Sequence, residues 1–170
     1  MSLWPEFQDV PGILPALNAA GIEHARIDNM WHFSDVPAAQ AFAASWDALS
    51  AARSIQADAA AAHKWEVISG GHTTATGIPL YTSIDDITMI TGLYNTACAG
   101  SPMAVYTFKD RSKIYRSLTV AQVQSLYLDV SAWVQLAFLA EQALTQEIMA
   151  APTWQAVMAI DVTAGWPANS

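Results

Sequence analysis

The chain has 170 residues, of which 53% are hydrophobic and 13% charged, a composition that suits one domain of ordinary size, alone or with a small appendage. Its formal net charge of −8 disfavours nucleic acid and anionic membranes as general partners. The single cysteine, Cys98, excludes an intrachain disulfide framework and is interpreted as a small buried hydrophobe.

The first 62 residues are expected to form a small N-terminal module. A short helix over residues 13–20 should end at Gly21, because glycine readily adopts the left-handed conformation that closes helices. Residues 24–33 then predict a β-hairpin around the two-residue turn Asp28-Asn29. Residues 1–12, before the first helix, are irregular and contain two large aromatic residues, Trp4 and Phe7. These side chains can anchor the segment to its own domain or to a neighbouring protein.

A long alanine-rich helix is expected to join this module to the rest of the chain. Ser34 or Asp35 caps its start, and Pro37 suits its first turn because a missing N–H group costs little there. The helix runs to about Lys64 and should act as a strut, since the Gly, Ser and Pro residues of flexible linkers are scarce in it. A second domain then follows over residues 63–170.

Two further hairpin-then-helix units are predicted in this second domain. Residues 65–83 suggest two strands with a wide polar connection, followed by a helix that starts at Ser83 and ends at Gly100. Residues 103–118 predict another hairpin, which leads into the last long helix. With the unit over residues 24–62, the pattern predicts an α+β fold of small antiparallel sheets packed by helices. The third hairpin has a basic tip, most simply a solvated turn, whose side chains are candidates for contact with an acidic partner surface: Lys109, Arg111 and Lys113.

The longest uninterrupted pattern is a helix over residues 119–151. Thr119 and Gln122 predict a capping box at its start, and its polar side chains argue against a membrane span. One apolar stripe runs along it and is interrupted only at Glu141, which is expected at the solvated edge or paired with Arg116 or another chain. A final short helix is expected after Pro152. The members of the stripe are Val120, Val123, Tyr127, Val130, Val134, Ala137, Leu144 and Ile148.

No sequence pattern for catalysis or metal binding is apparent. The histidines never fall at the i, i+4 spacing of a helical zinc pair, and Gly70-Gly71 lacks the lysine of a phosphate-binding loop. We therefore expect no metal, no cofactor and no enzymatic activity. Tryptophan is unusually frequent, and Trp31 and Trp166 lie near a turn and the C-terminus, where aromatic residues often anchor interfaces. A sugar-binding aromatic shelf is the alternative interpretation of these tryptophans.

Several short motifs follow one another in a distinctive order between Trp65 and Pro167. They are Gly77-Ile78-Pro79-Leu80 with Thr82, Leu118-Thr119, Glu147-Ile148, Ala150-Ala151, Ala159-Ile160-Asp161 and Gly165-Trp166-Pro167. In this order the chain resembles a domain of unknown function found in bacteriophage and prophage tail-fibre and tail-fibre assembly proteins. Ser83 and the tip Asp110-Arg111-Ser112 depart from the usual pattern, without consequence for the fold.

The resemblance implies a virion tail protein that is made in the host cytoplasm and works by contact. We expect a non-enzymatic structural component attached to the tail fibre or baseplate, which forms a homo-oligomer and binds other tail proteins. One alternative is a tail-fibre assembly chaperone that is absent from the mature virion. Another is a carbohydrate-binding or receptor-binding module at the tail tip.

Overall fold

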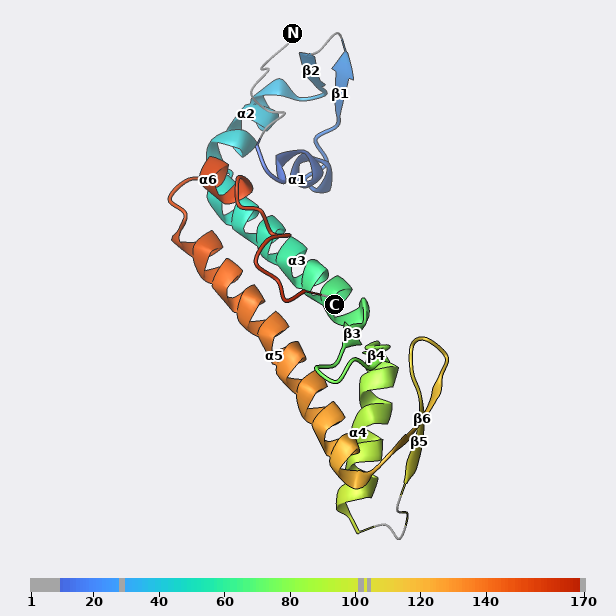
Figure 1. Cartoon of the computed structure of the whole chain (residues 1–170). Coiled ribbons are helices and arrows are strands. Elements are labelled where there is room, and N and C mark those ends of the chain that lie inside the picture. Colours follow the sequence, from blue (N-terminus) through green and yellow to red (C-terminus); the bar gives the residue numbers. More distant parts are fainter. Residues whose placement is uncertain (1–9, 28–29, 101–102, 104, 169–170) are drawn as a thin grey trace. The chain divides into compact units, whose positions relative to one another are not determined.

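The structure, a computed structural model, describes residues 10–27, 30–100, 103 and 105–168. Within these residues it contains six helices and three two-stranded antiparallel sheets (Figure 1). This arrangement confirms the predicted α+β class and the three hairpin-then-helix units. The elements are α1 Ile13–Ala19, β1 His24–Ile27, β2 Met30–Phe33, α2 Val36–Ser45, α3 Ala48–Ser69, β3 His72–Thr73, β4 Pro79–Leu80, α4 Ile84–Cys98, β5 Tyr106–Lys109, β6 Tyr115–Leu118, α5 Val120–Ala150 and α6 Trp154–Met158.

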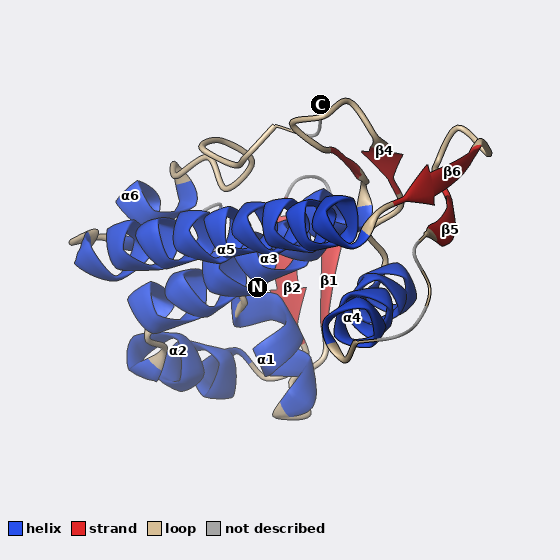
Figure 2. Ribbon diagram, turned by 60° about the horizontal axis from the view of Figure 1, so that its bottom comes forward, coloured by secondary structure: helices blue, strands red, loops and turns tan. Residues whose placement is uncertain are grey.

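The chain divides into two compact units. The first contains residues 1–59 and 146–161, and the second contains residues 60–145 and 162–170. Each unit is therefore built from segments that are distant in the sequence. Strands form only short ribbons in both units, and helices make up most of the described chain (Figure 2).

The first unit packs the β1–β2 hairpin and helix α2 around helix α1. Ile13 and Leu17 of α1 are almost completely buried and share a core with Ala39 of α2. The hairpin pairs His24 with Phe33, as its predicted register requires, and its turn, Asp28-Asn29, lies outside the described residues. Asp35 caps α2 by accepting a hydrogen bond from the backbone N–H of Ala38 at 3.0 Å.

The predicted alanine-rich strut is not one helix, because it breaks between Ser45 and Ala48. Asp47 accepts a hydrogen bond from the backbone N–H of Ser50 at 2.9 Å, which caps a new helix, α3. The hydrogen bonds from Ser50 also lower the pKa of Asp47. Trp46 leaves the helical path, stacks on Phe42, and donates from its indole N–H to the carbonyl of Pro11 at 3.1 Å. Helix α3 therefore starts anew at Ala48.

Helix α3 continues to Ser69, so the strand predicted from Trp65 is wrong. Val67 and Ile68 favour strands intrinsically, but here they form a core with Trp133 and Ala137 of α5. Burial against α5 outweighs their local preference. The predicted second hairpin shrinks to two residues in each strand, with His72 and Thr73 paired to Leu80 and Pro79.

The second unit packs helices α4 and α5 and the β5–β6 hairpin around one core (Figure 1). The predicted capping box at Thr119 and the predicted helix start at Ser83 are both confirmed, and the start at Ser83 is a capping box too. Ser83 and Asp86 hydrogen-bond reciprocally at the start of α4, and Gln122 accepts from the N–H of Thr119 at 2.9 Å at the start of α5. The buried members of the core are Leu80, Ile90, Ala97, Tyr106, Phe108, Leu118, Val123, Leu126 and Val130.

Helix α5 has 31 residues and buries most of the predicted stripe. Val123, Val130, Ala137 and Ile148 are at most 2% exposed, and Trp133 widens the buried face. By length and composition alone, α5 is also apolar enough to span a membrane. Of its most apolar 18-residue segment, 28% is buried in the structure. The final helix, α6, begins after the cap Thr153 and ends at Met158, whereas the sequence predicts a helix over residues 153–162.

Candidate functional site

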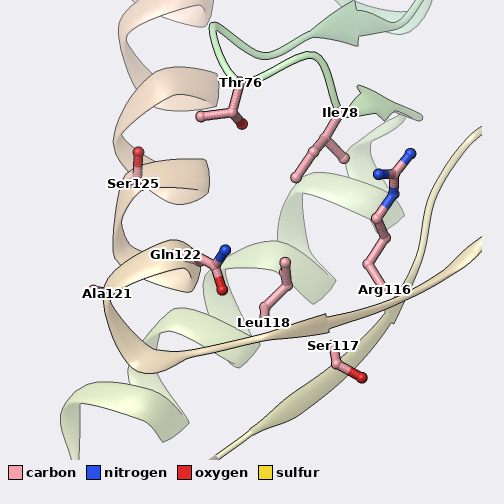
Figure 3. Close-up of a pocket in the computed structure, with 8 residues that line it drawn as sticks. All are labelled: Thr76, Ile78, Arg116, Ser117, Leu118, Ala121, Gln122 and Ser125. Atoms are coloured by element: carbon pink, nitrogen blue, oxygen red, sulfur yellow. The ribbon is translucent and has the colours of Figure 1, made fainter.

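A recess of about 480 Å³ opens at the start of helix α5 in the second unit. The loop between β3 and β4 forms one wall, and the end of β6 with the first turns of α5 forms the other (Figure 3). Ile78 and Leu118 supply apolar surface, and Gln122 presents its amide from α5. The lining residues are Thr76, Ile78, Arg116, Ser117, Leu118, Ala121, Gln122 and Ser125.

Local hydrogen bonds give the loop wall of this recess its shape. The hydroxyl of Thr74 accepts a hydrogen bond from the N–H of Ile78 at 3.0 Å and lies 3.0 Å from the hydroxyl of Thr76. The N–H of Ala75 donates to the carboxylate of Asp129 on α5 at 2.7 Å. The β3–β4 loop is thus tied both to itself and to the long helix.

Arg116 is the charged residue among those that line the recess, and its guanidinium is engaged by Asp110. Arg116 Nη2 lies 2.8 Å from Asp110 Oδ2, and the Asp110 side chain is completely buried. Burial raises the pKa of Asp110, but hydrogen bonds from the N–H of Ile114 and from Arg116 outweigh it and hold the pKa below its usual value. Asp110 is therefore a structural anion beneath the hairpin tip. The recess can accept hydrogen-bonding groups of a ligand or partner through its hydroxyl and amide groups.

The predicted basic tip does not present three free cations. Arg111 turns inward and donates to the carbonyl of Gly70 at 3.0 Å. The ammonium group of Lys109 lies 5.3 Å from the ring centre of Tyr115 on the same hairpin. Lys113 has a positive φ of 64°, which is typical of a tight turn. Its backbone N–H donates a hydrogen bond to the backbone carbonyl of Asp110 at 2.9 Å. Arg111 thus ties the tip to the loop that follows α3.

Glu141, which interrupts the apolar stripe, is paired inside the second unit. Both of its carboxylate oxygens accept from the ammonium group of Lys64 on α3, at 2.9 and 3.0 Å. Lys64 is 7% exposed and also lies over the rings of Trp65 and Phe138. Arg116 is therefore the wrong partner for Glu141, whose side chain is paired with Lys64 and 22% exposed.

The two described tryptophans predicted at an interface are half-buried in the core of their own unit. Trp31 packs against the core around α1, and Trp166 packs against Val67 and Trp133. The indole N–H of Trp166 donates to the carbonyl of Val162 at 2.8 Å. Trp4 and Phe7 lie outside the described residues.

A buried histidine contact was not predicted from the sequence. His72 of β3 is 8% exposed and stacks on Trp133 at a centroid distance of 4.9 Å. Its Nε2 atom lies 3.6 Å from Asp129 Oδ1. Asp129 and Trp133 lie four residues apart on α5 and therefore on the same side of the helix. Nothing in the sequence pattern links this pair to His72. Among the described residues no group of three or more His, Cys, Asp or Glu side chains is placed to hold a metal ion.

Cys98 is exposed at the end of α4, so its interpretation as a buried hydrophobe is wrong. A hydrogen bond with Cys98 raises the pKa of Tyr94, whose ring stacks on Tyr127 of α5 at 4.1 Å. The aromatic pair, rather than the thiol, supplies the packing between α4 and α5 at this level.

The face of α5 that points away from its buried stripe is apolar and exposed. Leu128, Leu136 and Leu139 are 61%, 53% and 57% exposed. No charged residue occurs between Asp129 and Glu141, although the chain as a whole has a net charge of −8. We call the five exposed apolar positions on this face the outer stripe: Leu128, Ala132, Leu136, Leu139 and Ala143.

Residues 40–164 match a protein family described as a domain of unknown function (DUF4376). The chain belongs to this family. The matched region covers helices α3, α4, α5 and α6 and therefore includes the recess, the Lys64–Glu141 pair and the outer stripe. No curated protein and no solved structure shows significant similarity to the chain.

Proposed function

We propose that this protein is a non-enzymatic structural component of a bacteriophage tail, attached to the tail fibre or baseplate. In this proposal it is made in the host cytoplasm, enters the virion tail, and works through contacts with other tail proteins and with copies of itself. The phage context rests on the order of the motifs between Trp65 and Pro167, which resembles that of tail-fibre and tail-fibre assembly proteins. Membership of the DUF4376 family is consistent with that resemblance.

The outer stripe of α5 is the observation that best supports a function through protein–protein contacts. Solvated surfaces of soluble proteins are normally rich in charged side chains and lack long apolar patches. Here a helix face with three leucines more than half exposed, and no charge between Asp129 and Glu141, lies on the surface of an acidic chain. Such a face is typical of a protein–protein interface.

Mass spectrometry of purified phage particles tests this proposal. A structural component is expected in the particles at a fixed ratio to the other tail proteins, and the tagged chain should co-purify with a fibre or baseplate protein from infected cells. A chain that binds a fibre protein in cells but is missing from particles is an assembly chaperone instead. A chain that does neither has no role in the tail.

A further inference from the structure

The outer stripe has the spacing of a seam for another α-helix. Its members, Leu128, Ala132, Leu136, Leu139 and Ala143, follow one another at steps of four, four, three and four residues. This near-heptad spacing keeps the five positions on one side of α5. The stripe is about 22 Å long at a rise of 1.5 Å per residue, which is long enough for one helix–helix contact.

The order of large and small residues in the stripe is complementary to itself when it is reversed. If two copies of α5 run antiparallel about a point between Gln135 and Leu136, Leu128 of one copy meets Ala143 of the other. In the same register Ala132 meets Leu139. Leu128 and Leu139 of each copy therefore face an alanine of the other copy, which lets the helices approach closely, and Leu136 lies next to the centre, level with Gln135. A parallel pair in register would instead place leucine over leucine and alanine over alanine.

The charges on α5 favour the same antiparallel arrangement. The helix carries three charged residues, all acidic: Asp129, Glu141 and Glu147. Glu141 is occupied by Lys64 on its own chain. Reversal about the same point places Asp129 level with Gln142, and Glu147 level with Gln124, of the other copy. A parallel pair would set Asp129 against Asp129 and Glu147 against Glu147, which is unfavourable for two chains of net charge −8.

From these three observations we infer that the outer stripe binds a second copy of this chain, with two α5 helices antiparallel about a twofold axis between Gln135 and Leu136. Such an interface is isologous, because the same patch serves on both copies. The contact is small and uncharged, so the dimer should be concentration-dependent, with a dissociation constant on the order of 10 μM. This inference rests on the proposed function in one respect: both assume that the chain acts through protein–protein contacts.

Sedimentation of the full chain between about 1 and 100 μM tests the dimer. The wild-type chain should pass from monomer to dimer over this range. Leu136→Glu places two carboxylates beside the axis and should weaken the dimer at least about 100-fold. Met89→Glu is the matched control, since it adds the same charge at a 55% exposed apolar residue of α4 and should leave the dimer unchanged. A monomeric wild-type chain overturns the inference, and one that instead floats with phosphatidylcholine vesicles assigns the stripe to lipid.

Cysteine cross-linking tests the register without a destabilising charge. In a Cys98→Ser background, Leu136→Cys should give a covalent dimer with a short thiol-specific cross-linker, because residue 136 lies beside the axis in both copies. Leu128→Cys should not give this product, because the two copies of residue 128 are about 22 Å apart along the direction of the helices. Cross-linking at both positions, or only at residue 128, overturns the antiparallel register. A dimer with the predicted cross-link that never binds a tail protein upholds this inference and ends the proposed function.

Discussion

Lys64 of α3 and Glu141 of α5 form an ion pair across the second unit, with Lys64 Nζ 2.9 Å from Glu141 Oε2. The pair is 77 residues apart in the sequence, and the lysine side chain is only 9% exposed. The rings of Trp65 and Phe138, at 5.0 and 4.4 Å, border the ammonium group. A charge in this position is stable only while its partner is present, because a buried ammonium group without a counter-ion is strongly disfavoured.

Glu141→Ala should therefore lower the free energy of unfolding by about 3 kcal/mol, because it leaves Lys64 buried and unpaired. Urea unfolding followed by circular dichroism measures this change. Glu147→Ala, at an exposed glutamate of the same helix, is the matched control and should change stability by less than about 0.5 kcal/mol. The double change Lys64→Met with Glu141→Leu should recover most of the loss. An equal effect of Glu141→Ala and Glu147→Ala would show that the ion pair contributes nothing.

Thr82 is a second buried polar residue whose loss should be measurable. Its hydroxyl is fully buried, donates to the carbonyl of Ile68, and accepts from the N–H of Gly71 at 3.0 Å. Thr82→Val keeps the volume but leaves both backbone groups unsatisfied, so it should cost about 2 kcal/mol. Thr96→Val is the control, because the hydroxyl of Thr96 is exposed and bonds only within its own helix, to Gly92. The same urea midpoint for both variants would contradict this reading of Thr82.

Two glycine substitutions should have opposite signs. Gly71 has a φ of +94°, and an added Cβ atom would lie 1.9 Å from the guanidinium of Arg111 and 3.0 Å from the carbonyl of Leu80. Gly71→Ala should therefore destabilise the chain by more than about 1 kcal/mol. Gly92 lies within α4 with open space around it, so Gly92→Ala should stabilise the chain by about 0.5–1 kcal/mol. Thermal unfolding gives both signs, and a stabilising Gly71→Ala would refute the close approach of Arg111.

Asp110 should make stability depend on pH below neutrality. Its folded pKa lies below its usual value, so its carboxylate stabilises the fold above the unfolded pKa of about 3.9, and this contribution is lost as pH falls through the folded pKa. Asp110→Asn should lower the urea midpoint at pH 7, and the difference from wild type should shrink toward pH 3. Asp58→Asn, at an exposed aspartate of α3, should change the midpoint little at either pH. A difference that stays constant with pH would remove Asp110 from the acid transition.

Local signals in the sequence predicted the helix starts, whereas tertiary contacts decided what was missed. The capping box at Thr119 and the helix start at Ser83 depend only on residues three positions apart, and both are present as predicted. The start of α3 after Asp47 has a comparable local signal in Asp47 and Ser50, but the alanine-rich sequence on both sides favours one continuous helix. Val67 is helical only because of its contact with α5, and no local pattern contains that contact.

The candidate site was less predictable than the fold. The sequence pattern marks Glu141 as an exception to its stripe, but spacing along α5 does not indicate its partner, because Lys64 lies on another helix. Burial of His72 against Trp133 likewise depends on how the β3–β4 loop meets α5. The outer stripe was readable in principle, since its residues repeat at helical spacing. The buried stripe of the same helix is longer and more regular, so it dominates the sequence pattern.

The two long helices set a limit on how this chain can be divided or exchanged. The boundary between the compact units falls inside α3 at residues 59–60 and inside α5 at residues 145–146. A truncation at either point would cut a long helix in two. Each half would then lack some of the residues that the intact helix packs against its core. Neither unit can therefore be produced as one continuous segment of the chain, because each combines two segments that are distant in the sequence.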